Sequence, residues 1–528
     1  MPDRRARITP ESPSGQLAAA LEALREEFTV PQGFPSDVLA EAEHATPPEP
    51  GLDLRDLPFV TLDPPGARDL DQAFHIERAG AGAGGSHGSG SGFTVRYAIA
   101  DVPGFVSPGG TLDAEARTRG QTLYLPDGSV PLHPPVLSEG RASLLPGQDR
   151  SAYVWTIALD ADGAPIDTRV ERALIRSRAQ LAYPSAQRAI DRGEAAEPLA
   201  LLREVGELRI AQERARGGAS LNLPEEEIVR DARGYRIERR MPLPVEEWNA
   251  QVSLLTGMAA AGIMLDGGIG ILRTMPKPAP DALHDFRARV RALGQPWPAG
   301  VSYGEYLRAL AHDSPRTAAI LQAAASLFRG ADYAAFDGAP PETQEQAAIA
   351  APYAHVTAPL RRLVDRWGLV ICEALCADRP VPAWVGESLP ELPALMRASS
   401  ARAGQLAAAA LDRVEAALLR DHTGEAFEAV VLEQRGGSVR VQIVDPPVTA
   451  SCPLAAEGTS AAPGTSAASG TTAAPGTTAA PGNSSAPGAT AAAGHGSGPG
   501  TVAAPGTVMR VRVVRADVPS GTIELAPA

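Results

Sequence analysis

The spacing of hydrophobic residues changes along the chain and predicts regions of different architecture. Between residues 50 and 245, short apolar runs alternate with polar residues and are separated by glycine and proline, which predicts strands and turns. One stretch there, Leu199–Arg216, has helical spacing instead. From Pro244 to about Arg420 apolar residues recur every three or four positions, which predicts helices, and the alanine-rich stretch Ala398–Leu419 favours a long closing helix.

After Gly424 the alternation of hydrophobic and polar residues returns, with a hairpin turn predicted at Gly436–Gly437. The end of the chain alternates in the same way. Between these two stretches, residues 452–506 consist mostly of Ala, Pro, Gly, Thr and Ser. Such a composition cannot bury enough apolar surface to offset its chain entropy and predicts disorder. The flanking stretches resemble one S1-type OB β-barrel interrupted by this insertion.

These patterns predict an α+β protein in three parts. Residues 1–49 form an N-terminal extension with a helix near Gln16–Glu27, residues 50–420 form the main domain, and residues 421–528 form the C-terminal domain. Within the main domain the Gly- and Ser-rich run 79–92 predicts a flexible loop. A chain of 528 residues is long enough for two or three domains with hydrophobic cores.

Charge and cysteine content narrow the possible functions only slightly. The net charge of −14 does not favour a nucleic-acid-binding protein by its sum, although binding depends on the local field of a channel. The three cysteines form neither a disulfide framework nor a zinc pattern. The N-terminus lacks the layout of a signal peptide, and the most apolar stretch, Val252–Leu272, is interrupted by Asp266 and by glycines. We therefore expect a cytoplasmic protein without membrane contact.

Candidate chemistry begins in the segment Thr61–Phe74, which reads T-L-D-P-P-G-A-R-D-L-D-Q-A-F. Asp63, Asp69 and Asp71 lie within nine residues, in a loop that follows a short apolar run. Carboxylates this close repel one another unless a cation lies among them. Hard oxygen ligands suit Mg²⁺ or Mn²⁺ rather than zinc. From this segment alone, a solvated turn with capping aspartates is the alternative.

A second candidate segment, Tyr353–Asp365, reads Y-A-H-V-T-A-P-L-R-R-L-V-D. Thr357 is suited to cap a helix that runs to about Cys376, with Pro359 in its first turn. Arg361 and Arg362 would then lie in that first turn too. They are either a pair of surface arginines or an anion site, in which guanidinium groups and helix N–H donors face one phosphate.

Together the two segments resemble the ribonuclease II / ribonuclease R family of RNB-domain 3′→5′ exoribonucleases. Further similar blocks follow in family order, and the resemblance covers roughly residues 50–420. These blocks are V-R-Y-A-I-A-D-V at 95–102, R-G-Q-T-L-Y-L-P-D at 119–127, L-S-E-G-R-A-S-L-L-P-G at 137–147, A-L-I-R-S-R-A-Q-L-A-Y at 173–183 and V-E-E-W-N-A-Q-V-S-L-L-T-G-M at 245–258.

The resemblance implies a mixed α/β RNB catalytic domain followed by a C-terminal S1-type barrel, in a short form without N-terminal cold-shock domains. It implies hydrolytic 3′→5′ cleavage of single-stranded RNA to 5′-nucleoside monophosphates, with Mg²⁺ as cofactor and Mn²⁺ as an alternative. The expected partner is single-stranded RNA, and the expected state is a monomer.

The family's metal-binding positions fall on Asp63, Asp69, Asp71 and Gln72. The fourth is an aspartate in the family, so Gln72 is a departure that adds no charge to the site. Asp71 matches the aspartate assigned to the metal and the attacking water, and Arg361 the arginine that contacts the scissile phosphate. Arg362 is expected to support the RNA channel.

The family's RNA contacts carry over to four further residues. Tyr124 matches an aromatic that stacks on the 3′-terminal base, and Leu223 lies opposite, where relatives have phenylalanine. Tyr183 and Glu246 match positions that bind the ribose. From the residues alone, Tyr124 fits a core tyrosine equally well, and Glu246 fits a first-turn acid that stabilises its helix.

Two other interpretations stay open. The first is a catalytically weakened RNA-binding protein on the same fold, suggested by Gln72, by Leu223 and by the few aromatic and basic residues of the C-terminal domain. The second is a different metallohydrolase on this scaffold.

Overall fold

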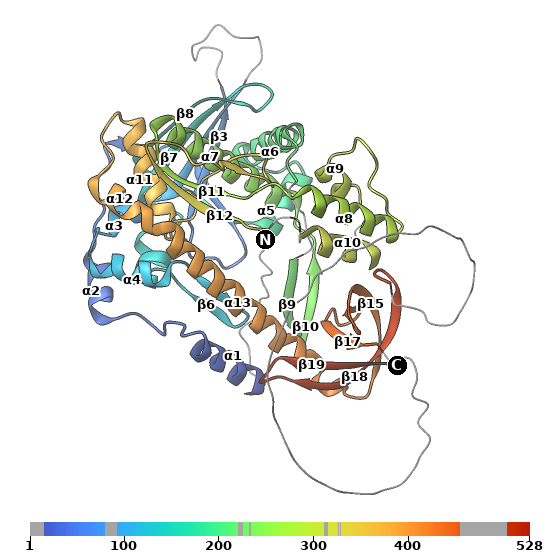
Figure 1. Ribbon diagram of the computed structural model, residues 1–528. Helices are drawn as coiled ribbons and strands as arrows, with labels where there is room; N and C mark the ends of the chain where they lie inside the picture. Colours follow the sequence, from blue (N-terminus) through green and yellow to red (C-terminus); the bar gives the residue numbers. More distant parts are fainter. Residues whose placement is uncertain are drawn as a thin grey trace, which may run out of the picture.

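The computed structural model confirms an α+β fold with a C-terminal barrel (Figure 1). It describes residues 15–79, 92–219, 225–231, 234–310, 315–325, 327, 329–454 and 504–528. The predicted flexible loop at 79–92 and the predicted disorder at 452–506 therefore lie almost entirely outside the described residues.

The main domain is built on a six-stranded sheet with the order β1-β8-β2-β3-β4-β7. Its strands are β1 (Leu52–Asp53), β2 (Phe59–Asp63), β3 (Gln72–Arg78), β4 (Phe93–Ala100), β7 (Asp149–Leu159) and β8 (Pro165–Ala182). The long strand β8 pairs along its first part with β7 and along its last part with β2, so the sheet curls back on itself. Because β2 and β8 are parallel partners, their C-terminal ends at Asp63 and Ala182 lie side by side.

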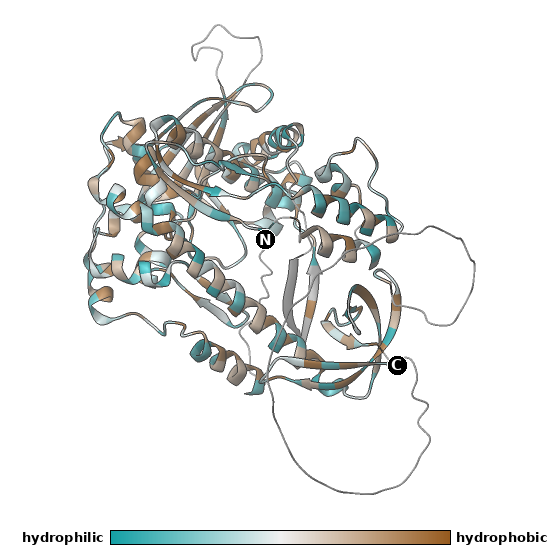
Figure 2. Ribbon diagram, viewed as in Figure 1, coloured by the Kyte–Doolittle hydropathy of each residue, from teal (hydrophilic) through white to brown (hydrophobic). Residues whose placement is uncertain are grey.

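Helices cover both faces of this sheet. On one face lie α6 (Glu197–Arg216), α7 (Pro244–Gly267) and α11 (Asp365–Cys376), whose apolar residues join those of the strands in a large core around Trp155 and Trp367. On the other face lie α2 (Ser36–His44) and α3 (Val102–Phe105). Because both faces are covered, the strands are mostly hydrophobic in Figure 2.

The predicted helices in the N-terminal extension and at the end of the main domain are confirmed. The N-terminal helix α1 (Gly15–Glu27) packs along α13 (Leu392–Leu419), which begins six residues before the predicted alanine-rich stretch. Both alternate between hydrophilic and hydrophobic residues in Figure 2, as expected of helices that bury one face. The remaining helices are α4 (Thr111–Arg119), α5 (Tyr183–Asp191), α8 (Pro280–Ala292), α9 (Tyr303–Arg308), α10 (Pro315–Ala325) and α12 (Ala383–Ser388).

Three short two-stranded sheets complete the main domain. They pair β5 (Leu123–Leu125) with β6 (Gly128–Val130), β9 (Glu225–Asp231) with β10 (Gly234–Arg240), and β11 (Ile269–Thr274) with β12 (Asp332–Asp337). A smaller pair joins β13 (Glu345–Gln346) and β14 (Ala351–Pro352).

The prediction that a helix starts near Thr357 is wrong, because α11 begins only at Asp365. Residues 358–362 form a single turn, in which the Arg361 and Arg362 N–H groups both donate to the Ala358 carbonyl. The turn does not continue as a helix because its backbone bonds elsewhere. The Arg361 carbonyl accepts from Thr122 N at 3.0 Å, and Leu363 N donates to Gly120 O at 3.0 Å. We call residues 357–364 the arginine turn.

The C-terminal domain is a nearly closed five-stranded barrel, as expected. Its order is β17-β16-β15-β18-β19, and β17 (Thr449–Pro453) lies beside β19 (Thr522–Pro527). The hairpin of β15 (Ala426–Arg435) and β16 (Ser438–Ile443) turns at Gly436–Gly437 as predicted, and β18 (Val508–Asp517) follows the insertion. The predicted start of the insertion at 452 is too early, because buried Cys452 pairs with Val439 inside β17.

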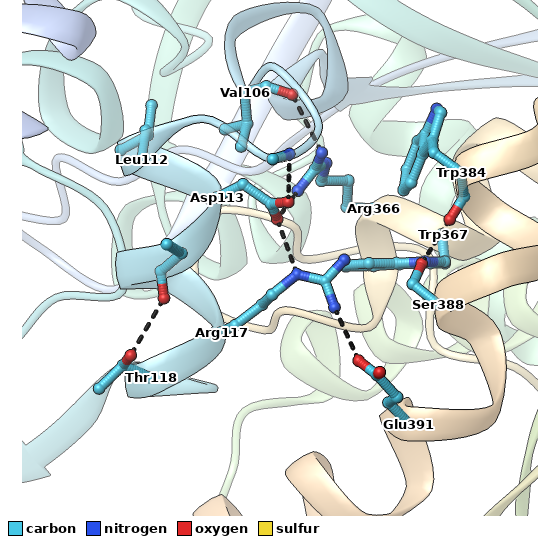
Figure 3. A network of polar contacts seen from close by, with 12 residues as sticks. Val106, Leu112, Asp113, Arg117, Thr118, Arg366, Trp367, Trp384, Ser388 and Glu391 are labelled. Carbon is cyan, nitrogen blue, oxygen red and sulfur yellow. Dashed lines mark hydrogen bonds and ion pairs between the residues drawn. The ribbon is translucent and has the colours of Figure 1, made fainter.

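A buried ion pair joins α4 to the start of α11 (Figure 3). Asp113 accepts hydrogen bonds from Arg366 Nη1 at 2.5 Å, from Arg117 Nε at 3.2 Å and from Gly109 N at 2.9 Å. The Arg366 guanidinium also donates to the Val106 carbonyl at 3.1 Å and lies 4.8–5.0 Å from the rings of Trp384 and Trp367. Since α4 leads directly into residues 120–122, this pair also holds the strand that bonds the arginine turn.

Breaking this pair should destabilise the protein strongly. In Asp113→Ala the Arg366 cation stays buried without its carboxylate, and we expect a loss of about 3–5 kcal/mol in the free energy of unfolding. Urea unfolding measures it. Arg397→Ala is the control, because the Arg397–Asp332 pair lies at the surface and its loss should leave the unfolding midpoint unchanged. Equal midpoints for the two variants would contradict the role of the buried pair.

Candidate active site

The three aspartates of the acidic loop are brought to the ends of neighbouring strands. Asp63 is the last residue of β2, and Asp69 and Asp71 lie just before β3. The loop is anchored by its backbone, since Leu70 N donates to Ser143 Oγ and Ala100 N donates to the Asp71 carbonyl. The turn between Asp63 and Asp69 requires a glycine at position 66, because the φ of 81° there would strain a residue with a side chain.

Asp71 is the point where the acidic loop meets the arginine turn. Its Oδ1 accepts a hydrogen bond from Leu360 N at 2.8 Å, and its Oδ2 lies 3.4 Å from Arg361 Nε. The Asp71 side chain is 5% exposed and that of Arg361 is 29% exposed. The structure therefore brings together the two residues expected to carry the catalysis, although they are 290 positions apart in the chain.

Burial makes the carboxylates of this site hard to ionise. It raises the pKa of Asp63 to about 7 and that of Asp71 to about 8, against the opposing effect of the Arg361 guanidinium. The charge of Asp69 raises both values further. Within the described structure, Asp63 Oδ2 is buried without a hydrogen-bond partner.

These carboxylates fit a hard divalent cation by the type of their donor atoms. A cation among them would supply the missing partner of Asp63 Oδ2 and offset the cost of ionising both buried groups. In the described part of the chain no three His, Cys, Asp or Glu side chains are gathered closely enough to hold a metal by themselves. An ion here would therefore also use water or substrate oxygens, which Mg²⁺ commonly keeps.

Gln72 bridges two segments of the site instead of pointing a free amide oxygen at the carboxylates. Its amide nitrogen donates to the Thr357 carbonyl, and its amide oxygen accepts from the Tyr97 hydroxyl at 3.2 Å. Thr357 is held further by Ser253, whose hydroxyl lies 3.0 Å from that of Thr357. Metal coordination by Gln72 stays a prediction, and it would compete with the bond to Tyr97.

Tyr124 reaches the site through the strand that bonds the arginine turn. Thr122 N donates to the Arg361 carbonyl, and Gln121 pairs with Arg362. Burial acts to lower the pKa of Arg361, whereas Asp71 and then Tyr124 act to raise it, so the net direction is upward. The half-buried ring of Tyr124 in β5 thus lies near the arginine expected to bind phosphate.

Arg362 stabilises the arginine turn. Its Nε donates to Asp365 Oδ2 at 2.8 Å and its Nη2 donates to Asp365 Oδ1 at 2.7 Å, a bidentate pair with a fully buried carboxylate. The same carboxylate accepts from Ala358 N at 2.6 Å. These bonds stabilise the turn, and the expected support of an RNA channel by Arg362 stays a prediction.

Of the residues expected to bind ribose, Tyr183 lies near the carboxylates. It follows Ala182, the partner of Asp63 in the sheet, and its hydroxyl accepts from Asn249 Nδ2 at 3.3 Å. Burial and then the charge of Asp63 raise the pKa of Tyr183 to about 12.

Glu246 caps the start of α7. Its carboxylate accepts from Leu243 N at 2.9 Å and pairs with Arg240 through both of its oxygens. Glu246 thus stabilises the start of its helix, which was the alternative to ribose binding, and ribose binding by Glu246 stays a prediction. Leu223 lies outside the described residues.

Sequence reasoning missed three residues that shape the site: Tyr97, Asp365 and Asn249. Tyr97 is a fully buried tyrosine on β4, and a hydroxyl among the apolar residues of the buried face, Val95 and Ile99, was the available signal. Asp365 follows Arg362 by three residues, a spacing that favours an ion pair on one turn. Nothing in the sequence pointed to Asn249.

Two protein-family profiles match this chain. The RNB domain matches residues 52–371, which is more than half of the chain, and the RNase II-type exonuclease C-terminal S1 domain matches residues 425–466. The chain belongs to the RNB-domain family. The resemblance inferred from the acidic loop and the arginine turn is therefore confirmed.

Relatives of this RNB protein include enzymes and an inactive homologue. It is 32% identical to ribonuclease R of Escherichia coli (strain K12) over 331 residues, covering 60% of this chain and 39% of that enzyme. It is 41% identical over 139 residues to a protein of Arabidopsis thaliana named inactive exonuclease DIS3L2, covering 26% of this chain and 12% of that protein. This RNB protein thus spans well under two thirds of the length of these relatives.

A solved structure shares the fold. The apo form of Mycoplasma genitalium RNase R superposes with a TM-score of 0.80 at 17% identity, covering 97% of this chain and 78% of that one. The same enzyme in complex with ribose-methylated single-stranded RNA gives a TM-score of 0.79 at 16% identity, with the same coverage.

The raised pKa values of Asp63 and Asp71 predict an unusual pH dependence of stability. The folded RNB protein without metal holds these protons up to about pH 7–8, whereas the unfolded chain loses them near pH 4. Burial lowers the pKa of His133 and of His355, which has the opposite effect, so the contribution of the two aspartates is the difference in free energy of unfolding between the wild type and Asp63→Asn, Asp71→Asn. This difference should fall as pH rises from 5 to 8 in chelator. Mg²⁺ should restore stability, and more at pH 8 than at pH 6. Urea unfolding at several pH values measures both effects.

The control for this dependence is the double variant Asp63→Asn, Asp71→Asn. It should lose both the pH dependence attributable to the site and the response to Mg²⁺. If the stability of the wild type relative to the double variant rises between pH 5 and 8 in chelator, Arg361 keeps the carboxylates ionised, against the expectation.

The bridging role of Gln72 predicts a loss of stability that does not depend on metal. Gln72→Leu removes both hydrogen bonds and leaves the Thr357 carbonyl without its partner, which should cost about 1–3 kcal/mol in chelator. Gln32→Leu is the matched control, because Gln32 is exposed and bonds the exposed Glu22. If Gln72→Leu changes stability only when Mg²⁺ is present, the residue acts as a ligand and not as a bridge.

Proposed function

We propose that this RNB protein is a hydrolytic 3′→5′ exoribonuclease that degrades single-stranded RNA to 5′-nucleoside monophosphates. The observation that carries the proposal is the meeting of Asp71 with Arg361 and Leu360 N in a buried site beside Asp63. Membership of the RNB family supports the reaction class. The cofactor we propose is Mg²⁺, with Mn²⁺ as the alternative.

Asp63, Asp69 and Asp71 are the residues that would hold the metal. A bound divalent ion activates water and neutralises charge on the phosphoryl group that is attacked. The chain's own contribution is orientation. Leu360 N fixes one oxygen of Asp71, and the buried carboxylate holds the neighbouring guanidinium of Arg361 in place. A guanidinium fixed in this way stabilises charge that develops on the phosphate without having to reorganise.

The RNA side of the site is proposed from Tyr124 and Tyr183. Tyr124, near Arg361, offers a ring on which the last base can stack without regard to sequence. Tyr183, near Asp63, offers a hydroxyl suited to the ribose 2′-OH, which distinguishes RNA from DNA. The M. genitalium relative that binds single-stranded RNA supports RNA as the partner. Leu223 would close the stacking site from the other side.

We further propose a monomer that acts in the cytoplasm. The three cysteines are all free, as expected of a reducing compartment. Among the described helices none has the length and hydrophobicity needed to span a bilayer.

A catalytically weakened RNA-binding protein is the second candidate. It is favoured by Gln72, because this amide makes two bridging hydrogen bonds at a position where the family resemblance implies a carboxylate. A relative named as an inactive exonuclease shows that loss of activity occurs among similar proteins. The intact acidic loop and its contact with Arg361 favour the enzyme.

The two candidates differ in the effect of Asp71→Asn. With Mg²⁺ and 5′-labelled single-stranded RNA, the wild type should produce a ladder of fragments shortened from the 3′ end, and a 3′ label should appear at once in a mononucleotide. Asp71→Asn should bind the RNA equally well but not cleave it, because an amide adds no charge for the metal. Gel assays and filter binding measure the two properties.

Asp162→Asn, at an exposed loop position far from β2 and β3 in the sequence, is the control and should retain full activity. If the wild type and Asp71→Asn bind RNA equally and neither cleaves it, the RNA-binding candidate replaces the enzyme. Release of a 5′ label as the first mononucleotide would contradict the proposed direction.

A further inference from the structure

A pocket of about 630 Å³ adjoins the acidic loop. One wall consists of residues 64–68, which lie directly between Asp63 and Asp69 in the chain. The other walls are Leu145, Pro146 and Gln148, and residues 180–182 at the end of β8. The segment that lines the pocket is therefore the same segment that carries a metal-binding candidate at each of its ends.

The sheet register brings this pocket next to Asp63. Asp63 pairs with Ala182 at the end of β2 and β8, and both Ala182 and Pro64 line the pocket. As far as the structure is described, no wall residue comes from the strand of Tyr124 or from the arginine turn. The segments that form the pocket beside the carboxylates are therefore different from those that carry Tyr124 and Arg361.

The pocket wall combines one cation, two amides and apolar surface. The Arg68 side chain is 71% exposed and has a weak ion pair with Glu139 at 3.3 Å, while its backbone carbonyl is fixed by Ser143 Oγ at 2.6 Å. Gln148 and Gln180 are exposed amides, and Gln180 donates to the Ala67 carbonyl at 2.7 Å. Pro65, Leu145, Pro146 and Leu181 supply the apolar part.

This combination suits a nucleoside monophosphate. A volume within the range of about 300–1,000 Å³ is usual for small-molecule sites, and such sites pair apolar walls with a few polar groups. Apolar wall can cover a base, amides can bond a ribose or base edge, and an arginine can bind the phosphate bidentately. A phosphate monoester carries a charge of about −1.5 to −2 at neutral pH, so Arg68 would attract it.

We propose that this pocket binds the nucleoside 5′-monophosphate after cleavage and is its way out of the site. The inference rests on the proposed function. The remaining RNA strand would still occupy the side of Tyr124 and Arg361, so a product that left on that side would require the strand to withdraw. A product that passes the loop 64–68 leaves the strand in place. Arg68 attracts the released dianion outward.

The first test is calorimetric titration of the full chain with 5′-AMP in chelator, which removes binding through a metal. Arg68→Ala should weaken 5′-AMP binding by about tenfold or more, because a hydrogen-bonded charge is lost. Ala67→Trp, which fills the pocket, should abolish it. Arg203→Ala, an exposed arginine on α6 paired with Glu207, is the matched control and should bind as the wild type does. Adenosine should bind weakly and equally to the wild type and Arg68→Ala.

The second test separates product release from cleavage. In a single turnover on RNA, Arg68→Ala should cleave the first nucleotide at the wild-type rate. Over many turnovers it should be less inhibited by added 5′-AMP than the wild type. Thermal unfolding shows whether Ala67→Trp is folded. If that variant is unfolded, Arg68→Ala tests the proposal by itself, because Arg68 is exposed and its replacement should leave the fold intact.

The outcomes distinguish this inference from the proposed function. Wild-type affinity for 5′-AMP in both pocket variants, with normal RNA cleavage, overturns the pocket and leaves the nuclease intact. Binding of 5′-AMP that depends on Arg68 in a protein that never cleaves RNA supports a nucleotide site while the proposed function fails. Binding of inorganic phosphate as tight as that of 5′-AMP overturns recognition of the nucleoside part.

Discussion

The contact of Asp71 with the arginine turn is the constraint on which the site depends. A carboxylate and a guanidinium, held by segments about 290 residues apart, meet where both are largely removed from water. Each favours the charged form of the other, because Arg361 opposes the rise in the pKa of Asp71, and Asp71 raises the pKa of Arg361. The Leu360 N–H bond fixes the carboxylate at 2.8 Å, so the orientation of one segment determines that of the other. The rest of the fold can be understood as a means of keeping these two segments in register.

Three sets of contacts keep that register, and they act on different parts of the arginine turn. Asp365 holds the turn from its C-terminal side through Ala358 N and Arg362. Gln72 holds it at Thr357 from β3. The segment 120–122 holds its backbone at Arg361, and the buried Asp113–Arg366 pair ties α4, the helix before that segment, to α11. A turn fixed on three sides can present a guanidinium without the help of substrate, which lowers the cost of organising the site.

Much of this architecture could be predicted from local patterns, and the departures have a common cause. The helices at 15–27, 197–216 and 392–419, and the hairpin at Gly436, follow from periodicity and turn chemistry. The start of α11 does not, because backbone groups of residues 361 and 363 bond with residues 120–122, which no local rule reveals. Likewise, Gln72 could be compared with a family position, but its two hydrogen bonds depend on Tyr97 and Thr357, which only the fold brings near. Pairing between distant segments is what sequence periodicity cannot supply.

The net charge of the whole chain does not describe the acidic loop, where carboxylates and arginines lie close together. With a net charge of −14, the protein as a whole would repel RNA, so the proposed binding of RNA would rely on cationic groups close to the site. Arg361 contacts Asp71, and Arg68 lies between Asp63 and Asp69 on the loop that lines the pocket, so an arginine that attracts phosphate adjoins the acidic centre on each of these two segments. Only a bound cation makes the centre attractive. Metal binding would thus decide whether a phosphate binds at the carboxylates. After cleavage, Arg68 would attract the free phosphate dianion more strongly than a phosphodiester of the intact strand, because the dianion carries more charge.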